Sequence, residues 1–296
     1  MEGDFSEICY NAEYSWMLAE FVGLLSGQKK IAAMELKSLT DANKLKRILK
    51  KYDPLGNYNY LITPAYDWIK KVNPEYRLNL FIGKNADLKD FERYYKQPQK
   101  HSIEVNQKIG EGLSYPKCCT YAVNFNKPFT YYFKAGEVNK IDYRINNLYL
   151  RSGSNAILIR HYVCNYSCRK SIRYSIKVLS FLKKKFPEIY EFYLRVLKMP
   201  VMMVAAHRLP GRIVGDSVIY TFEGSFVAKT LRYSKVYYHG KQPGTQYLNK
   251  EEGEQIFRQL LKGNELKLTK YGADIYKYGE CKDSIFNDRL IFIKPY

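Results

Sequence analysis

The sequence has few features of a membrane or secreted protein. Its apolar runs, of which Val201–Ala206 is among the longest, fall far short of the roughly 20 residues that cross a bilayer. The N-terminus, MEGDFSE, lacks the basic segment of a signal peptide. We therefore expect a soluble cytoplasmic protein without membrane contact. In that reducing compartment the 6 cysteines are better explained as metal ligands or reactive thiols than as disulfides.

Acidic residues are also scarce. The chain carries 48 Lys and Arg against 29 Asp and Glu, a net charge of +19, and its 46% of hydrophobic residues argues against disorder. This excess favours a polyanionic partner, because counterions are released when Lys and Arg meet phosphate. The 29 Tyr and 15 Phe supply rings on which bases can stack. Nucleic acid, in particular RNA or tRNA, is the expected partner, although Lys-rich surfaces also occur in thermophilic proteins that bind nothing.

Common catalytic motifs are missing. No Walker loop, nucleophile elbow or pair of catalytic carboxylates occurs. The run Gly110-Glu111-Gly112 lacks the third glycine and the preceding strand of a dinucleotide site. These absences argue against P-loop and hydrolase chemistry and leave open whether the protein is an enzyme.

Hydrophobic periodicity predicts an α/β protein, α+β overall, in three segments. Residues 1–97 alternate helices and strands in an N-terminal α/β layer, residues 98–197 form a mostly helical region with the cysteine pairs, and residues 198–296 form an α+β region packed on it. The expected helices cover 5–25, 40–52, a short piece near Trp68, 87–95, 169–185, 188–197 and 250–261. The expected strands cover 30–36, 58–63, 77–83, 155–160, 213–222, 225–238, 266–270, 275–278 and 290–293.

Three local signals mark the ends of these elements. Gly27 is expected to end the first helix, and Thr40-Asp41 to cap the second. Glu223-Gly224 separates two runs of β-branched and aromatic residues and predicts the turn of a hairpin.

Four of the six cysteines form two close pairs, which is the strongest functional signal in the sequence. Cys118 and Cys119 are adjacent at an expected helix start, and Cys164 and Cys168 lie where an expected strand runs into a helix. A metal and a helix N-terminus both favour thiolates, so two such pairs can complete four sulfur ligands. Buried cysteine without function is the alternative. Cys9 lies in the apolar stripe of the first helix, and Cys281 has no histidine nearby.

The spacing bears on the choice of metal. A vicinal pair and a CxxxC pair both differ from the CxxC spacing that is usual in structural zinc sites, whereas iron–sulfur ligation tolerates irregular spacing. A [4Fe–4S] cluster held by the two cysteine pairs, through three or four ligands, is therefore the first expectation, and zinc is the alternative. The run Cys164-Asn-Tyr-Ser-Cys168-Arg-Lys-Ser171 also resembles the CxxxCxxC pattern of radical SAM proteins with Ser171 in third place. That departure argues against radical SAM chemistry unless Cys118 or Cys119 completes the site.

The two runs that contain the cysteine pairs carry a family resemblance. They are Gly112-Leu-Ser-Tyr115-Pro116-Lys-Cys118-Cys119 and His161-Tyr-Val-Cys164-Asn-Tyr-Ser-Cys168. In these runs the chain resembles the uncharacterised, mainly archaeal family DUF483, which usually has a further glycine where this sequence has Ser114. The resemblance covers about the middle third of the chain. It implies that the pairs belong together and that the source is archaeal, and it names no reaction.

Histidines and basic residues next to these runs are further candidates. His161 precedes Cys164 by three residues and could act as a ligand, a proton donor or an orienting group. His207 lies beside Arg208 and Arg212, which could clamp a phosphate with His207 as acid or base. Arg169, Arg173 and Lys177, with Lys184, fall on one face of the helix after Cys168, either as a solvated face or as a phosphate-binding ridge.

Three functions follow from these patterns. The first is an iron–sulfur protein that acts on a polyanion such as RNA, including sulfur transfer or RNA modification at an open iron if only three cysteines ligate. The second is a zinc-stapled module that binds nucleic acid without catalysis. The third is a dithiol redox protein with Cys164 or Cys168 as the nucleophile.

Overall fold

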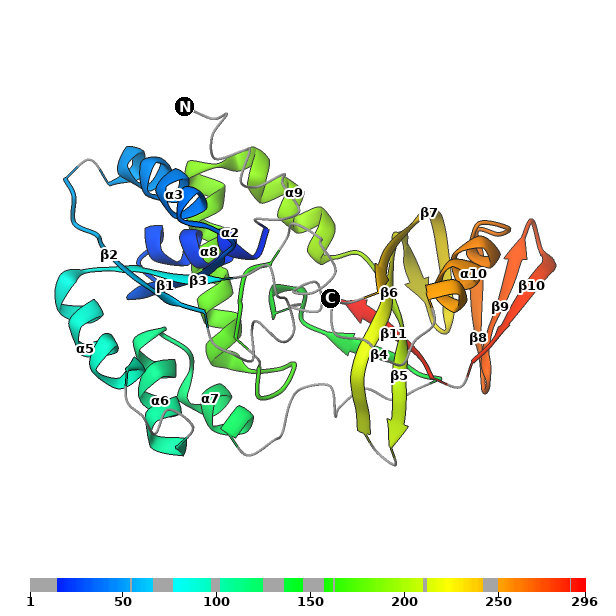
Figure 1. The fold of residues 1–296 in the computed structure, drawn as a ribbon. Coiled ribbons are helices and arrows are strands. Elements are labelled where there is room, and N and C mark those ends of the chain that lie inside the picture. The colour runs from blue at the N-terminus through cyan, green and yellow to red at the C-terminus, as the bar shows by residue number, and fades with distance from the viewer. Residues whose placement is uncertain are drawn as a thin grey trace. The chain divides into compact units, whose positions relative to one another are not determined.

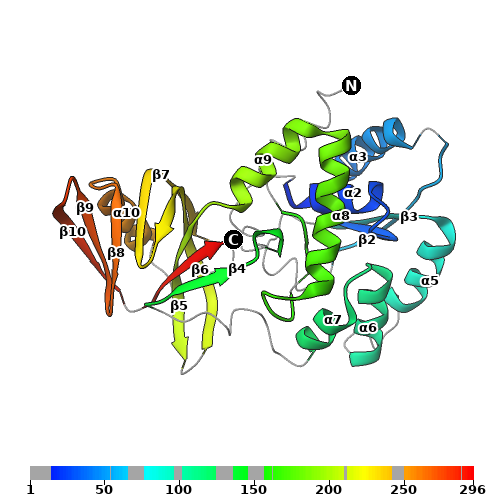
Figure 2. The ribbon, with the colours of Figure 1, turned by 180° about the vertical axis from the view of Figure 1, so that it is seen from behind.

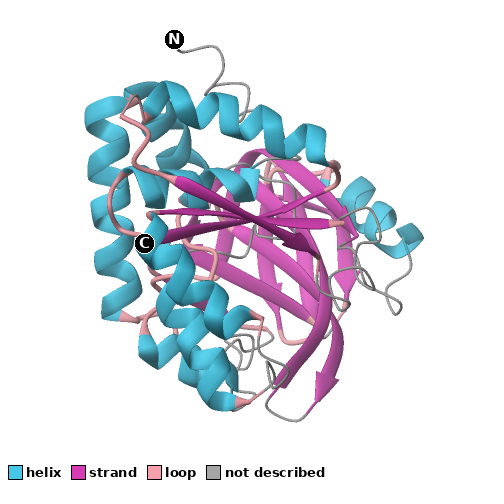
Figure 3. Ribbon diagram, turned by 60° about the vertical axis from the view of Figure 1, so that its left-hand side comes forward, coloured by secondary structure: helices cyan, strands magenta, loops and turns pink. Residues whose placement is uncertain are grey.

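The structure is a computed structural model, and it describes residues 15–53, 55–65, 77–96, 102–124, 136–145, 157–161, 163–209, 212–241, 250–287 and 289–296. In these ranges eight α-helices and eleven strands in two sheets confirm the mixed α+β class (Figures 1 and 3). The chain divides into two compact units. Unit 1 comprises residues 1–128, 155–164 and 168–193, and unit 2 comprises residues 129–154, 165–167 and 194–296. The three segments predicted from the sequence stay a prediction.

Unit 1 contains a small antiparallel sheet with helices on both faces. Its strands lie in the order β1-β3-β2, and β3 pairs with both neighbours. Helices α2 and α3 contact β1, while α5 packs against the other face through Phe91 and Tyr95, which meet Phe81 of β3. The elements are α2 (Ser15–Leu25), β1 (Ile31–Leu36), α3 (Leu39–Tyr52), β2 (Asn59–Pro64), β3 (Leu78–Gly83) and α5 (Asn85–Tyr95).

The ends of these helices follow local chemistry. Gly27 has a φ of 69° and its N–H donates to the Leu24 carbonyl, which ends α2 as predicted. The cap of α3 differs from the prediction. Ser38 is the N-cap residue, and Asp41 returns a hydrogen bond to its backbone in a capping box, because Asp41 occupies the third helical position. The first ten residues of the predicted helix 5–25 and the helix near Trp68 lie outside the described residues.

Four further helices belong to the central part of the chain. The last two of them confirm the helices predicted after Cys168, and the chain is interrupted between them just before Pro187. The predicted strand 155–160 is wrong for residues 157–160, which form no ladder. Arg160 instead reaches across to β1 through its side chain, and the preceding apolar side chains are buried. The helices are α6 (Ile103–Gly112), α7 (Lys117–Asn124), α8 (Arg169–Lys185) and α9 (Pro187–Leu197).

Unit 2 is built on an eight-stranded sheet in the order β10-β9-β8-β7-β6-β5-β11-β4. All of its pairs are antiparallel except β11 with β4. Helix α10 covers one face, where Ile256 and Leu260 join the core of the sheet. The elements are β4 (Val138–Ile141), a 3-10 turn (Tyr143–Ile145), β5 (Val201–Leu209), β6 (Arg212–Val227), β7 (Thr230–Lys241), α10 (Lys250–Leu260), β8 (Glu265–Thr269), β9 (Gly272–Lys277), β10 (Glu280–Phe286) and β11 (Leu290–Pro295).

The hairpin of β6 and β7 turns later than predicted. Val227 pairs with Thr230, so the two-residue turn is Ala228-Lys229, and Ala228 has a φ of 50°. Glu223-Gly224 instead lies at a shift of register, a β-bulge inside a continuous strand. A glycine in a strand can mark a bulge as well as a turn, because in both places another backbone segment passes close to its Cα atom. Here a Cβ on Gly224 would lie 2.1 Å from the Arg232 carbonyl oxygen.

In the described residues, no helix combines the length and apolar character needed to cross a membrane.

Candidate metal centre

The four paired cysteines converge in unit 1 at the first turns of two helices. Cys118 and Cys119 lie in the first turn of α7, and Cys168 is the N-cap residue of α8. Cys164 lies in the short segment that leads into α8. The two views of the fold place α7 beside the end of α8 from which the chain enters that helix (Figures 1 and 2). The sequence predicted this set of residues, and their convergence is a finding of the structure.

The distances between these thiols are short. The Sγ atom of Cys168 lies 3.8 Å from that of Cys118 and 3.7 Å from that of Cys119, and the vicinal pair is separated by 4.0 Å. All four Sγ atoms lie within 4.8 Å of one another. None of the four forms a disulfide. Four sulfur atoms at this spacing can hold a metal ion.

The thiols differ in exposure and in protonation. Cys119 and Cys168 are buried, whereas Cys118 and Cys164 are partly exposed. Hydrogen bonds, of which that from Cys119 is the strongest, lower the pKa of Cys168 to about 4. The same bond raises the pKa of Cys119, and burial raises the pKa of Cys164 to about 12. The N-terminus of α8, where Cys168 lies, also favours the thiolate form, because the helix dipole stabilises negative charge.

A serine and a histidine lie behind the thiols. The Oγ atom of Ser171 lies 3.4 Å from the Cys168 sulfur and 3.5 Å from the Cys119 sulfur, and the Nε2 atom of His161 lies 2.8 Å from the same Oγ. Because a hydroxyl has one hydrogen, a serine that donates to Cys168 accepts from a protonated Nε2. Burial, followed by the charge of Lys29, lowers the pKa of His161 to about 3, so the ring is neutral.

A buried ion pair lies close to His161. The Lys29 Nζ atom lies 2.7 and 2.8 Å from the two carboxylate oxygens of Glu20, and Glu20 also accepts a hydrogen bond from the Ala33 N–H at 2.7 Å. Lys29 also stands 4.7 Å above the ring of Tyr115, which in turn contacts the His161 ring. Burial lowers the pKa of Lys29, and Glu20 opposes this shift. Sequence patterns gave no signal for this pair, because Glu20 and Lys29 belong to no motif.

The predicted phosphate-binding residues of α8 lie on its exposed face. Arg169, Arg173 and Lys177 are all exposed, as is Lys184. Helix α8 carries seven Lys or Arg residues and no Asp or Glu. Within the described part of the chain, none of the seven forms an ion pair with a carboxylate.

The other predicted residues lie apart from the cysteine group along the chain. His207 and Arg208 lie in β5, and Arg212 begins β6, where Arg208 pairs with Ile213 and Leu209 with Arg212. Their side chains, like the whole of Cys9, lie outside the described residues, so their roles stay predictions. Cys281 is exposed on the edge strand β10.

Comparison with family models, curated proteins and solved structures finds no match to this chain. The resemblance to DUF483 accordingly stays a prediction.

Proposed function

We propose that the four cysteines bind one zinc ion in a closed structural site, and that the unit stabilised in this way binds RNA through helix α8. The observation that carries the proposal is the position of Cys168. This residue is at once one of the four converging thiols and the N-cap residue of the basic helix. A metal bound there fixes the start of α8 and with it the direction of the helix's exposed cations.

The spacing of the thiols supports a single ion over a cluster. A zinc–sulfur distance of about 2.3 Å in a tetrahedron separates the sulfur atoms by about 3.8 Å. The three distances among Cys118, Cys119 and Cys168 are 4.0, 3.8 and 3.7 Å. In a [4Fe–4S] cluster each thiolate binds a different iron, which requires wider spacing. Zinc therefore fits this site better than the cluster expected from the sequence.

The ligand set supports a structural role for the metal. Zinc sites with four protein ligands are closed, whereas catalytic zinc keeps one position for water or substrate. Four thiolates around Zn²⁺ leave an excess of negative charge. The N-termini of α7 and α8 and the adjacent Arg169 and Lys170 offset this charge. A metal with four protein ligands has no open position for substrate, so the ligand set supports a binding function without metal catalysis.

The exposed face of α8 supports phosphate as the ligand. Its seven cations lie over 17 residues, a length of about 25 Å at 1.5 Å per residue. In the described part of the chain these cations form no ion pair with a carboxylate, and contacts of such cations with phosphate are strongly salt-dependent. RNA is the partner that the tyrosine-rich composition also favours.

Metal content tests the first half of the proposal. We expect the purified protein to be colourless with one zinc per chain, and Co²⁺ substitution to give the visible spectrum of tetrahedral cobalt thiolate. Chelation should lower the melting temperature. A brown protein with matching iron and sulfide would establish the cluster instead, and a metal-free protein with a reversible disulfide would establish the dithiol function.

Salt-dependent binding of a single-stranded RNA tests the second half. The variant Arg169→Gln/Arg173→Gln/Lys177→Gln should reduce the slope of log affinity against log salt by roughly 2, since each phosphate contact on a single strand contributes about 0.7. Zinc content should not change.

A matched variant controls for the loss of charge alone. Arg47, Lys50 and Lys89 are exposed on other helices of unit 1. Their replacement by glutamine removes the same charge away from α8 and should leave the slope nearly unchanged. Equal losses in both variants would show that binding follows net charge and not the α8 face.

A further inference from the structure

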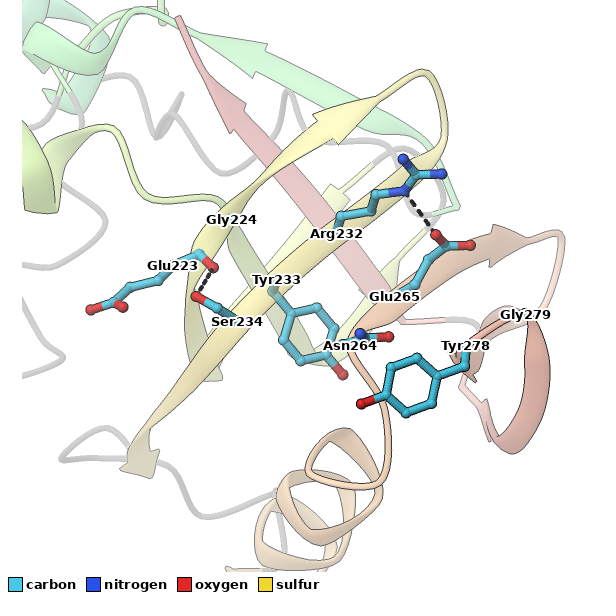
Figure 4. Close-up of a pocket in the computed structure, with 9 residues that line it drawn as sticks. All are labelled: Glu223, Gly224, Arg232, Tyr233, Ser234, Asn264, Glu265, Tyr278 and Gly279. Atoms are coloured by element: carbon cyan, nitrogen blue, oxygen red, sulfur yellow. Dashed lines mark hydrogen bonds and ion pairs between the residues drawn. The ribbon is translucent and has the colours of Figure 1, made fainter.

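Unit 2 contains a pocket at the point where strands β7 and β8 diverge. Strand β7 pairs with β8 only over Thr230–Arg232, and the last contact between them is the hydrogen bond from the Tyr233 N–H to the Asn264 carbonyl at 2.9 Å. Beyond it β7 continues with β6, and the bulge at Gly224 bends this pair. The resulting hollow has a volume of about 500 Å³ (Figure 4). Ligand pockets for small organic molecules fall in this size range.

A strained aromatic residue stands at the rim of this pocket. Tyr278 and Gly279 form the two-residue turn between β9 and β10, and their φ angles are 54° and 87°. Glycine or asparagine normally occupies such positions, and a bulky side chain there is rare. The Tyr278 side chain is also 87% exposed, and its ring extends toward Asn264 and Tyr233 (Figure 4). The backbone conformation disfavours a tyrosine at this position, and the side chain is not needed for packing because it is exposed. A role in binding would explain its presence.

The polar groups around the ring suit a nucleotide. The Asn264 amide lies between the rings of Tyr233 and Tyr278, where it can bond the edge of a base (Figure 4). The Nε atom of Arg232 donates to the Glu265 carboxylate at 2.9 Å in an ion pair. The Arg232 side chain is 72% exposed, so its other guanidinium nitrogens can contact a phosphate. The remaining carboxylate, Glu223, accepts a hydrogen bond from Tyr237 and points away from the rings.

We propose that this pocket binds one nucleotide of single-stranded RNA, with the base stacked on Tyr278, its edge at Asn264 and its phosphate at Arg232. The inference rests on the proposed RNA-binding function and adds a contact for a base to the phosphate contacts of α8. Stacking tolerates any base, so the pocket selects unpaired strands more than sequences. A duplex, whose bases are stacked on each other, cannot enter it.

Mononucleotides test the pocket separately from α8. The probes are the four 5′-nucleoside monophosphates, titrated into the zinc-loaded full chain by NMR or calorimetry. Tyr278→Ala should weaken binding roughly 5- to 100-fold, the effect of losing one stacked base. Tyr278→Phe should retain affinity because it keeps the ring. Tyr271→Ala removes another exposed tyrosine of the same unit, at a different turn, and should have no effect.

A glycine variant separates function from folding. Tyr278→Gly removes the strain of the left-handed conformation, so it should raise the melting temperature while weakening nucleotide binding as much as Tyr278→Ala. A folded, stabilised variant that binds nucleotides as the parent does would overturn the proposal, and so would failure of all four mononucleotides to bind the parent.

The two proposals fail separately. If the α8 variant has the reduced salt slope while Tyr278→Ala binds mononucleotides as the parent does, the pocket proposal is wrong and the RNA-binding function stands. If mononucleotides bind at Tyr278 but the α8 variant has the same salt slope as the parent, the pocket stands and the role of α8 is wrong. Photocrosslinking of thiouridine-labelled RNA should place a crosslink on Tyr278.

Discussion

The Nε2 atom of His161 lies 2.8 Å from the Oγ atom of Ser171, ten residues later in the chain. Because that oxygen also lies within 3.5 Å of two thiol sulfurs, the pair forms a short chain of polar contacts behind the four-cysteine group. Metal sites commonly have such a layer, in which hydrogen bonds fix the ligands and disperse their charge. In the proposed zinc site, Ser171, at the third position of the CxxxCxxC-like run, therefore supports the ligands and is not itself a ligand.

Removing the Ser171 hydroxyl should weaken the metal site without unfolding the chain. We expect Ser171→Ala to lower zinc affinity by about 10- to 100-fold, measured by competition with a chromogenic chelator. Ser180→Ala is the matched control, because Ser180 lies on the same helix and bonds only the Ile176 carbonyl on the surface. Equal affinities in the two variants would show that the hydroxyl does not support the ligands.

Each of the four clustered cysteines should be needed for the metal. Serine variants at Cys118, Cys119, Cys164 and Cys168 should each lose bound zinc and melt at a lower temperature, as the chelated parent does. Cys281→Ser, at the exposed thiol of β10, should keep one zinc per chain. Retention of zinc in Cys164→Ser alone would indicate three ligands and an open coordination position.

The buried pair of Lys29 and Glu20 should matter for stability. Lys29→Met leaves the Glu20 carboxylate buried without its ammonium partner, and we expect a loss of about 3–5 kcal/mol in the free energy of unfolding by urea. Lys29→Met/Glu20→Gln should cost less than the single change, because neither position then carries a charge. Lys282→Met breaks an exposed pair and should cost no more than about 1 kcal/mol. Equal costs for both lysines would show that the buried pair is not coupled.

Two small substitutions of opposite sign test where the β6–β7 hairpin turns. Gly224→Ala should destabilise the protein, by about 1–3 kcal/mol, because the added Cβ meets the backbone of β7. Ala228→Gly should stabilise it, by about 0.5–1 kcal/mol, because the φ of 50° at Ala228 favours glycine. Thermal or urea unfolding measures both. The reverse signs would place the turn at Glu223-Gly224.

The sequence predicts those elements whose pattern is local. The strands of unit 1 are apolar and bounded by breakers, and each was predicted to within two residues. Strand β10 was missed, because its sequence ECKDSIF carries charged, mostly exposed side chains. Strand β4 was missed as well, because its four residues gain their strand form only by pairing with the distant β11. Such pairing is a tertiary effect that periodicity does not record.

The candidate site divides in the same way. The two cysteine pairs are recognisable from their short spacing in the sequence. That the two pairs lie next to each other depends on how α7 and α8 pack, which the sequence pattern does not give. Ser114 gives a finer example. This residue has a φ of 60°, and its hydroxyl accepts a hydrogen bond from the Lys30 N–H at 2.9 Å. Ser114 thus adopts a backbone conformation that favours glycine while its side chain bonds Lys30, 84 residues earlier in the chain. No local sequence pattern could indicate this contact.

The parallel pairing of β4 with β11 sets a limit on how the chain can be cut. Strand β4 precedes α8 in sequence, yet it covers the edge of the sheet in unit 2. Residues Leu290–Ile293 of β11 are buried on both faces, so this strand is built for the interior of a sheet. A fragment that starts at residue 194 would uncover it as an apolar edge and polymerise by strand addition. Solubility of the C-terminal unit therefore depends on a short strand encoded before helix α8.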